Sequence, residues 1–104
     1  MSRTTKLPPV HPGEILREEF LAPLGLSASK FADHVDVPAN RITHILNGER
    51  KITADTALRF SKAFGTTPEF WMNLQVLYDL EVAQREAGAK IARSISPLRE
   101  IALA

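Results

Sequence analysis

The side chains with the clearest chemical potential lie in one short stretch, between Pro38 and Asn47. Apolar residues recur there at the i, i+3 and i+4 spacing that marks the buried side of a helix. The opposite side presents one small and three polar residues, which are Ala39, Asn40, Thr43 and His44. An asparagine can bond two atoms of an adenine edge, a histidine can donate or accept, and a methyl group can contact thymine. These four residues are therefore candidates for reading DNA bases, and the alternative is an exposed polar helix face without a partner.

Hydroxyl and cationic side chains flank this stretch along the chain. Residues of these two types contact DNA phosphates in many complexes, where they set the position of the protein on the duplex without reading its sequence. Backbone amides at the start of a helix add to such contacts, because they point toward the anion. The phosphate-contacting residues that we expect are Ser27, Ser29, Lys30, Arg41, Arg50 and Lys51.

Other kinds of chemical site find no support in the residue pattern. The three histidines, at positions 11, 34 and 44, have no i, i+4 pairing and no thiolate partner, since the chain has no cysteine. Glu18 and Glu19 are adjacent, so they point in different directions on a helix and do not form a catalytic pair. The sequence has neither a glycine-rich phosphate loop nor a nucleophile elbow. We therefore expect no metal, no cofactor and no enzymatic activity.

Length and composition indicate a single compact domain. The chain has 104 residues, of which 44% are hydrophobic and 24% are charged, as in ordinary globular proteins. No apolar run reaches the ~18 residues of a membrane span, and the first residues do not form a signal peptide. The formal net charge is only +1, so overall charge does not itself indicate a nucleic-acid partner. We expect a cytoplasmic protein that does not enter membranes.

Helical periodicity divides the chain into an arm, a domain and a tail. Three prolines among residues 1–12 favour an extended arm, because a proline has no amide donor. Residues 13–87 contain five stretches in which apolar residues have helical spacing, and no stretch alternates with the period of a strand. Residues 88–104 form a tail. We therefore predict an all-α domain whose helices lie at 14–21, 28–35, 38–46, 54–64 and 68–87.

Capping and breaking residues support these boundaries. Ser27 and Thr53 are suited to cap the second and fourth helices, since their hydroxyls can accept from the free amides of a first helical turn. Pro23, followed by Gly25, is expected to stop the first helix, and Gly88 is expected to end the fifth.

The second and third helices have the residue pattern of a helix-turn-helix. Two helices that cross at a steep angle need a small residue where they touch, and Ala32 occupies that position. Asp36 lies in the tight turn, where aspartate tolerates a left-handed backbone better than most residues do. Apolar anchors then fix the third helix against the rest of the domain, and these are Phe31, Val35, Val37, Ile42 and Ile45.

Three sequence strings extend this pattern beyond the two helices. They are His11–Leu16 (HPGEIL), Asn47–Arg59 (NGERKITADTALR) and Phe64–Gln75 (FGTTPEFWMNLQ). With the helix-turn-helix they cover about three quarters of the chain, and they resemble the XRE-type family of phage-repressor-like domains, within it the HigA group of antitoxins. Two residues depart from the family pattern. Asp36 stands where a glycine is usual, and Ala39 offers only a methyl contact at the first recognition position.

This resemblance implies a five-helix, lambda-repressor-like DNA-binding domain that forms a homodimer and binds an operator with an inverted repeat. It further implies that the chain neutralises a ribosome-dependent, mRNA-cleaving toxin, its cognate partner, and represses its own operon. The residues alone leave two other functions open. One is a stand-alone transcriptional regulator of the phage-repressor type, and the other is a protein-binding module whose helix-turn-helix has no DNA affinity.

A stripe of large apolar residues on the fifth helix has two candidate roles. It comprises Trp71, Leu74, Leu77 and Tyr78. Such spacing is typical of a monomer core, but the first four helices already supply a core-forming set, so part of the stripe is a candidate dimer or toxin interface. For the tail, the alternatives are disorder, packing on a dimer partner and ordering on the toxin.

Overall fold

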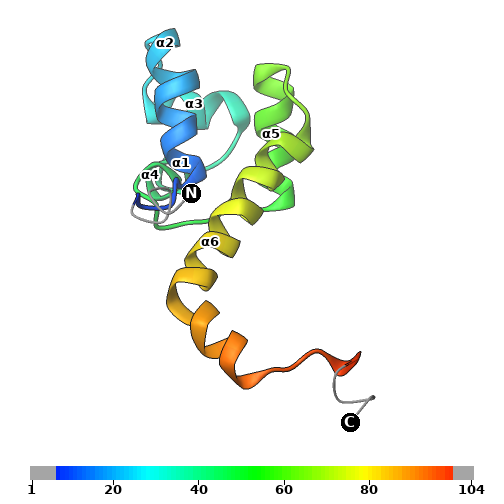
Figure 1. Ribbon diagram of the computed structural model, residues 1–104. Coiled ribbons are helices and arrows are strands. Elements are labelled where there is room, and N and C mark those ends of the chain that lie inside the picture. Colours follow the sequence, from blue (N-terminus) through cyan, green and yellow to red (C-terminus); the bar gives the residue numbers. More distant parts are fainter. Residues whose placement is uncertain (1–6, 100–104) are drawn as a thin grey trace.

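Residues 7–99 are described by the structure, a computed structural model, and they form five helical segments and no strand (Figure 1). The first segment is one continuous run of α1 (Pro12–Ile15), the π-helical η2 (Leu16–Leu21) and α2 (Ala22–Leu24). The others are α3 (Ala28–Val35), α4 (Ala39–Leu46), α5 (Ala54–Phe64) and α6 (Pro68–Ser94). The predicted all-α fold is confirmed, with α3 and α4 as its helix-turn-helix. Residues 1–6 of the predicted arm and 100–104 of the predicted tail lie outside the described part.

Polar residues that precede the helices set where the helices begin. Ser27 Oγ accepts the amide of Lys30 at 3.1 Å, and Thr53 Oγ1 accepts the amide three residues later at 3.4 Å, so both predicted caps are confirmed. Thr67 caps α6 in the same way. The cap of α1 was not predicted, because histidine is an uncommon capping residue: His11 Nδ1 accepts the amide of the residue two positions later at 2.9 Å.

The first helical run passes through Pro23, one of the two residues predicted to stop it, and ends at Leu24, directly before the other, Gly25. In an α-helix, a proline ring clashes with the carbonyl four residues earlier. Here the preceding residues form a wider π-helical turn, in which the amide of Ala22 donates to the carbonyl of Arg17, five residues back. The wider turn carries the chain past the proline. Gly25 then ends the run in a left-handed conformation, with φ of 61°.

The last helix is also longer than predicted, because α6 passes through Gly88 and ends at Ser94, a length of 27 residues. A lone glycine costs a helix only about 1 kcal/mol relative to alanine, and the alanines around it are the strongest helix formers. The second half of α6 extends away from the other helices (Figure 1). No helix within residues 7–99, α6 included, combines the length and apolar character that a membrane span needs.

The hydrophobic core lies between the first helical run, α3, α4, α5 and the first half of α6. Its largest fully buried side chains include Trp71, Phe31, Phe60, Leu16, Ile42, Ile45 and Ile52. Trp71 is 0% exposed, and its indole Nε1 donates to Thr66 Oγ1 at 2.9 Å. Of the two roles expected for the α6 stripe, Trp71 therefore has the first, the monomer core, which buries its ring and satisfies its donor.

The backbones of α1 and α4 touch at Gly13. A β-carbon on this residue would lie 1.9 Å from the carbonyl oxygen of Ile45, near the C-terminal end of α4. Gly13 and the preceding Pro12 are both buried. Only glycine allows the two backbones to approach so closely, so α1 fixes the position of the end of α4 directly through main-chain contact.

We predict that Gly13→Ala destabilises the domain by about 3 kcal/mol, because the added methyl meets backbone that cannot turn aside. Unfolding in urea measures the change. Gly88→Ala is the matched control: its methyl meets only the flexible Gln84 side chain, with the nearest carbon at 3.1 Å, and alanine favours a helix. The control is expected to match or exceed the stability of the unaltered protein. If Gly13→Ala were as stable as the control, the close crossing of α1 and α4 would be refuted.

Candidate nucleic-acid interface

The outer face of α4 is open to solvent along its whole length. Ile42 and Ile45 are fully buried on the inner side, and the four candidate base-contacting residues, Ala39, Asn40, Thr43 and His44, are all exposed. The Thr43 hydroxyl donates to the Ala39 carbonyl at 3.2 Å, which leaves its oxygen lone pairs available as acceptors. The structure thus gathers these residues on one exposed helix face, and their contact with bases remains a prediction.

The turn before α4 is a compact left-handed turn centred on Asp36. This residue has φ of 61° and ψ of 52°, and it is the single residue other than glycine with positive φ within residues 7–99. Its amide donates to the Asp33 carbonyl at 3.2 Å, and the Val37 amide donates to the Ala32 carbonyl at 3.0 Å. The expectation that aspartate takes the left-handed position is confirmed. The turn therefore keeps its tight geometry without glycine.

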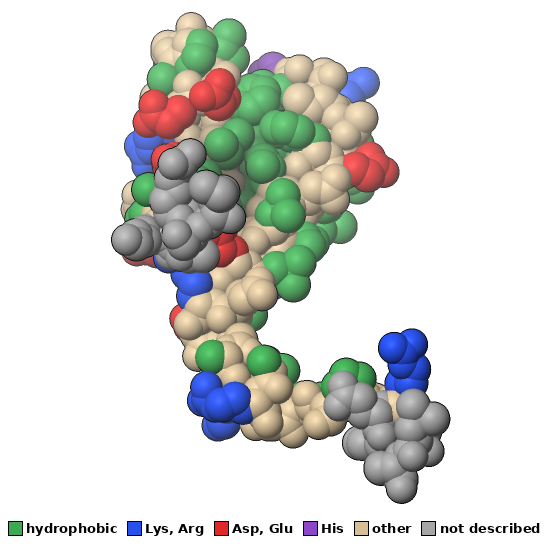
Figure 2. All heavy atoms as spheres, viewed as in Figure 1, with side chains coloured by type: hydrophobic (Ala, Val, Ile, Leu, Met, Phe, Trp, Pro, Cys, Tyr) green, Lys and Arg blue, Asp and Glu red, His purple; other side chains and the backbone are tan. Residues whose placement is uncertain are grey.

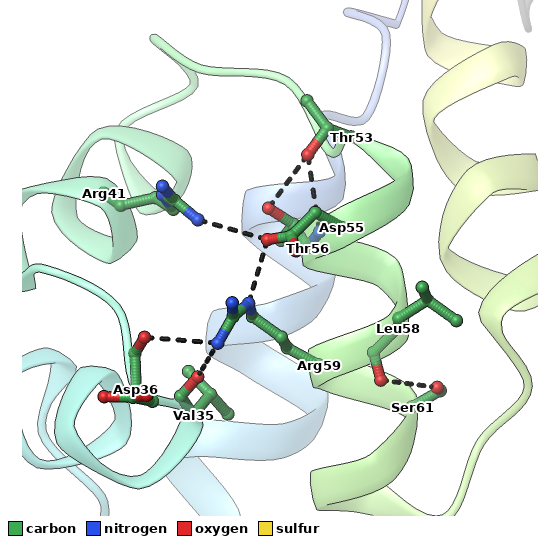
Figure 3. Close-up of polar contacts among 9 residues, drawn as sticks. All are labelled: Val35, Asp36, Arg41, Thr53, Asp55, Thr56, Leu58, Arg59 and Ser61. Carbon is green, nitrogen blue, oxygen red and sulfur yellow. Dashed lines mark hydrogen bonds and ion pairs between the residues drawn. The ribbon is translucent and has the colours of Figure 1, made fainter.

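A shared carboxylate ties this turn and α4 to α5 (Figure 3). Arg59 Nε donates to Asp55 Oδ2 at 2.9 Å, and Arg59 Nη1 donates to the carbonyls of Val35 at 2.8 Å and Asp36 at 3.2 Å. Arg41 Nη1 reaches the same Asp55 oxygen at 3.4 Å. The Arg59 guanidinium thereby satisfies carbonyls that the end of α3 leaves unpaired. Asp55 and Arg59 were missed by sequence reasoning, although their i, i+4 spacing is a pairing signal.

The charges in this cluster are mutually stabilising. The hydrogen bond from Arg59, reinforced by the positive charges of Arg59 and Arg41, lowers the pKa of Asp55 below its ordinary value despite some desolvation. The same hydrogen bond and the Asp55 charge raise the pKa of Arg59. Asp55 is therefore a carboxylate at neutral pH and accepts from two guanidinium groups.

The other end of α4 is held by the first helical run. Arg17 Nη2 donates to the Leu46 carbonyl at 3.0 Å, which satisfies one of the free carbonyls at the C-terminal end of α4. The His11 cap at the start of α1 lies beside this contact region, and its ring packs edge-on against Tyr78 with centroids 4.8 Å apart. Burial lowers the pKa of His11, although nearby Asp79 opposes the shift, so the neutral ring is favoured and its Nδ1 can accept.

A buried glutamine holds the loop that follows α4. Gln75 on α6 is 3% exposed, and its Oε1 accepts the Ile52 amide at 2.7 Å while its Nε2 donates to Asp79 Oδ1 at 2.9 Å. Asp79 in turn lies 3.9 Å from Lys51 Nζ. Sequence reasoning did not find Gln75, because a polar residue within an apolar stripe gives no sign of its partner.

The candidate phosphate-contacting residues lie at three places around α4. Ser27, Ser29 and Lys30 are exposed at the start of α3, and the Ser27 hydroxyl oxygen is already used as a helix cap. Arg50 and Lys51 are exposed in the loop after α4. Arg41 is half-buried and directed toward Asp55, and its buried Nε has no hydrogen-bond partner within residues 7–99. Its phosphate contact stays a prediction.

The residues of the α6 stripe have different surroundings. Leu74 packs partly against the core, Tyr78 is half-buried against His11, and Leu77 is 64% exposed. Two further apolar residues that the sequence analysis did not name, Val76 and Leu80, are also exposed. Hydrophobic side chains gather along α6 and the adjoining body on the face seen in Figure 2.

The chain is similar in sequence and in fold to several helix-turn-helix proteins. The model of a helix-turn-helix family matches residues 16–71. An addiction module antidote protein of a HigA family from Coxiella burnetii is 54% identical, with a TM-score of 0.84 over 88% of this chain and 99% of that chain. The Pseudomonas aeruginosa antitoxin HigA, solved with the higBA promoter, is 42% identical, with a TM-score of 0.85 over 86% and 98% of the two chains. Antitoxin HigA-1 of Vibrio cholerae is 41% identical over 78 residues, which is 75% of this chain and 73% of that protein.

Proposed function

The chain belongs to the helix-turn-helix family, in its XRE-type group with the HigA antitoxins, and we propose that it is an antitoxin that binds operator DNA through α4. The observation that carries the proposal is the open outer face of α4, held at both ends by the rest of the domain. A relative with the same fold was solved with promoter DNA, which supports the same use of the fold here.

In the proposed complex, α4 enters the major groove and its outer face meets base edges. Asn40 is suited to adenine, Ala39 can contact a thymine methyl, Thr43 can accept, and His44 can donate or accept. The cations and amides around α4 contact phosphates and fix its position on the duplex. If three to four phosphates are contacted by each protomer, log affinity falls with log salt by about 0.9 per contact.

We further infer a homodimer that forms along α6. Val76, Leu77 and Leu80 are 48%, 64% and 60% exposed, which is a large apolar surface for a monomer to leave in water. Val76, Leu80, Ala83 and Ala87 follow at intervals of four, three and four residues, the spacing of a helix–helix seam. A two-fold dimer would place two copies of α4 one turn of DNA apart, about 34 Å, on an inverted repeat.

The base-reading role of α4 is tested by replacing Asn40 and Thr43 with alanine together. Each good base contact contributes about 1 to 3 kcal/mol, so specific binding to a duplex from the upstream promoter should be lost while the fold, followed by circular dichroism, is retained. Arg50→Ala is the matched control, because loss of a phosphate contact should weaken binding to all sequences alike and reduce the salt slope by about one. Unchanged promoter affinity in the double variant would show that the base-reading assignment is wrong.

The antitoxin role is tested by co-expression with the product of the neighbouring gene. We propose that the chain binds this product, an mRNA-cleaving toxin, and that the pair represses its own operon. The two proteins should co-purify, and growth arrest caused by the toxin should be relieved. If promoter binding is observed but the neighbouring product neither co-purifies nor is neutralised, the chain is a stand-alone regulator.

The dimer is tested by Leu80→Glu, which places a charge in the seam. Light scattering after size-exclusion chromatography should give the mass of a monomer, and promoter affinity should fall because the two half-sites are no longer bound together. Leu24→Glu, at a comparably exposed leucine on α2, should remain dimeric. A Leu80→Glu variant with the mass of a dimer would place the interface elsewhere.

A further inference from the structure

We propose that Asp55 determines the specificity of the α4 surface by competing with DNA phosphates for Arg41. This inference rests on the proposed DNA-binding function and assigns a positioning role to a residue outside the recognition helix. Without DNA, Arg41 is paired with Asp55. On the operator, α4 lies deep enough in the groove for a DNA phosphate to replace Asp55 as the partner of Arg41. On other DNA sequences, Arg41 stays paired with Asp55.

Asp55 lies so close to α4 that its negative charge would oppose DNA binding if no cation were paired with it. It lies in the first turn of α5 with 59% of its side chain exposed, and its carboxylate is 3.4 Å from Arg41 on α4. A negative charge so near a DNA-binding helix repels phosphates. Two guanidinium groups offset that charge, so the cluster of two arginines and one aspartate carries a net positive charge.

The two arginines are held unequally. Arg59 makes a 2.9 Å bond to the carboxylate and two further bonds to main-chain carbonyls at the end of α3, so its guanidinium is fixed by three acceptors. Arg41 makes one longer bond of 3.4 Å to the same carboxylate. Leaving its present acceptors would cost Arg41 one long bond but would cost Arg59 three, so exchange is less costly for Arg41. Arg41 is therefore the member of the cluster that exchanges.

The place of Arg41 on α4 links this exchange to base reading. It follows Asn40 directly in the sequence and lies to one side of the exposed face. A phosphate can reach Arg41 only when the first turn of α4 lies close to the backbone of the duplex. In complexes where α4 lies farther from the duplex, Arg41 stays paired with Asp55. Arg41 therefore adds to the binding affinity only in the complex in which the base contacts are also made.

Asp55→Asn tests this inference, because it removes the charge and keeps the size of the side chain. Affinity is measured for a duplex enriched by in vitro selection from a randomised pool and for poly(dI-dC), each at several salt concentrations. We expect the ratio of the two affinities to fall about tenfold, within the range of coupling energies between contacting residues. Affinity for poly(dI-dC) should rise, and its salt slope should steepen by about 0.9 per protomer, because Arg41 is freed for one more phosphate.

Three further variants separate this role from a general effect of charge or stability. Glu69→Gln also removes an acidic group from the first turn of a helix, in α6, and should leave the affinity ratio unchanged. Adding Arg41→Gln to Asp55→Asn should return the poly(dI-dC) salt slope to its original value. Asp55→Glu keeps the charge and should retain most of the discrimination, so it tests the proposal even if the asparagine variant is unstable.

The outcomes distinguish the inference from the function on which it rests. If the unaltered protein binds both duplexes equally, the proposed operator-binding function is overturned, and the role of Asp55 with it. If the unaltered protein discriminates but Asp55→Asn changes both affinities by the same factor, Asp55 does not determine specificity. A salt slope that steepens equally in Glu69→Gln would likewise reject the specific release of Arg41.

Discussion

At Gly13 the backbone of α1 meets the carbonyl of Ile45 with no side chain between them, and the position of α4 follows from that contact. Arg17 adds a bond to the last carbonyl of α4 at the same end. At the other end, α4 is joined through Arg41 to Asp55 on α5. A helix fixed at both ends can present side chains at defined distances, which is what base recognition requires of a protein surface.

The features that depend only on residues close together in the sequence could be predicted from the sequence. Helix starts such as the one at Ser27 are local, and the exposed face of α4 follows from apolar spacing. A prediction was wrong where a local rule was outweighed, as at Pro23, where a π-helical turn accommodates the ring. At Trp71 the helical period left two roles open, and only the packing of the domain shows that the ring joins the core. Contacts such as those of Arg59 with the end of α3 and Gln75 with the loop after α4 join distant residues and leave no periodic signal.

The low net charge of +1 is compatible with DNA binding because of how the cations are distributed. Arg41 and Lys51 lie 3.4 Å and 3.9 Å from carboxylates, whereas Lys30 and Arg50 make no ion pair within residues 7–99. Long-range attraction to any duplex is weak, because it depends on the summed charge of the protein, which is close to zero. Affinity must then come largely from close contacts, and these form only where the shape and the bases of the site match α4.

The helix α6 connects this reading surface to the rest of the assembly. Its first turns bury Trp71 in the core and hold the loop after α4 through Gln75. The exposed apolar seam begins at Val76 and continues into the second half of α6, which extends away from the other helices (Figure 1). One unbroken helix therefore serves both the core and the seam. In a dimer formed along that seam, a change in the distance or the angle between the two copies of α4 would require bending α6, repacking the seam or disrupting the core. The half-site spacing would thus be set by the packing of α6 rather than by a flexible linker.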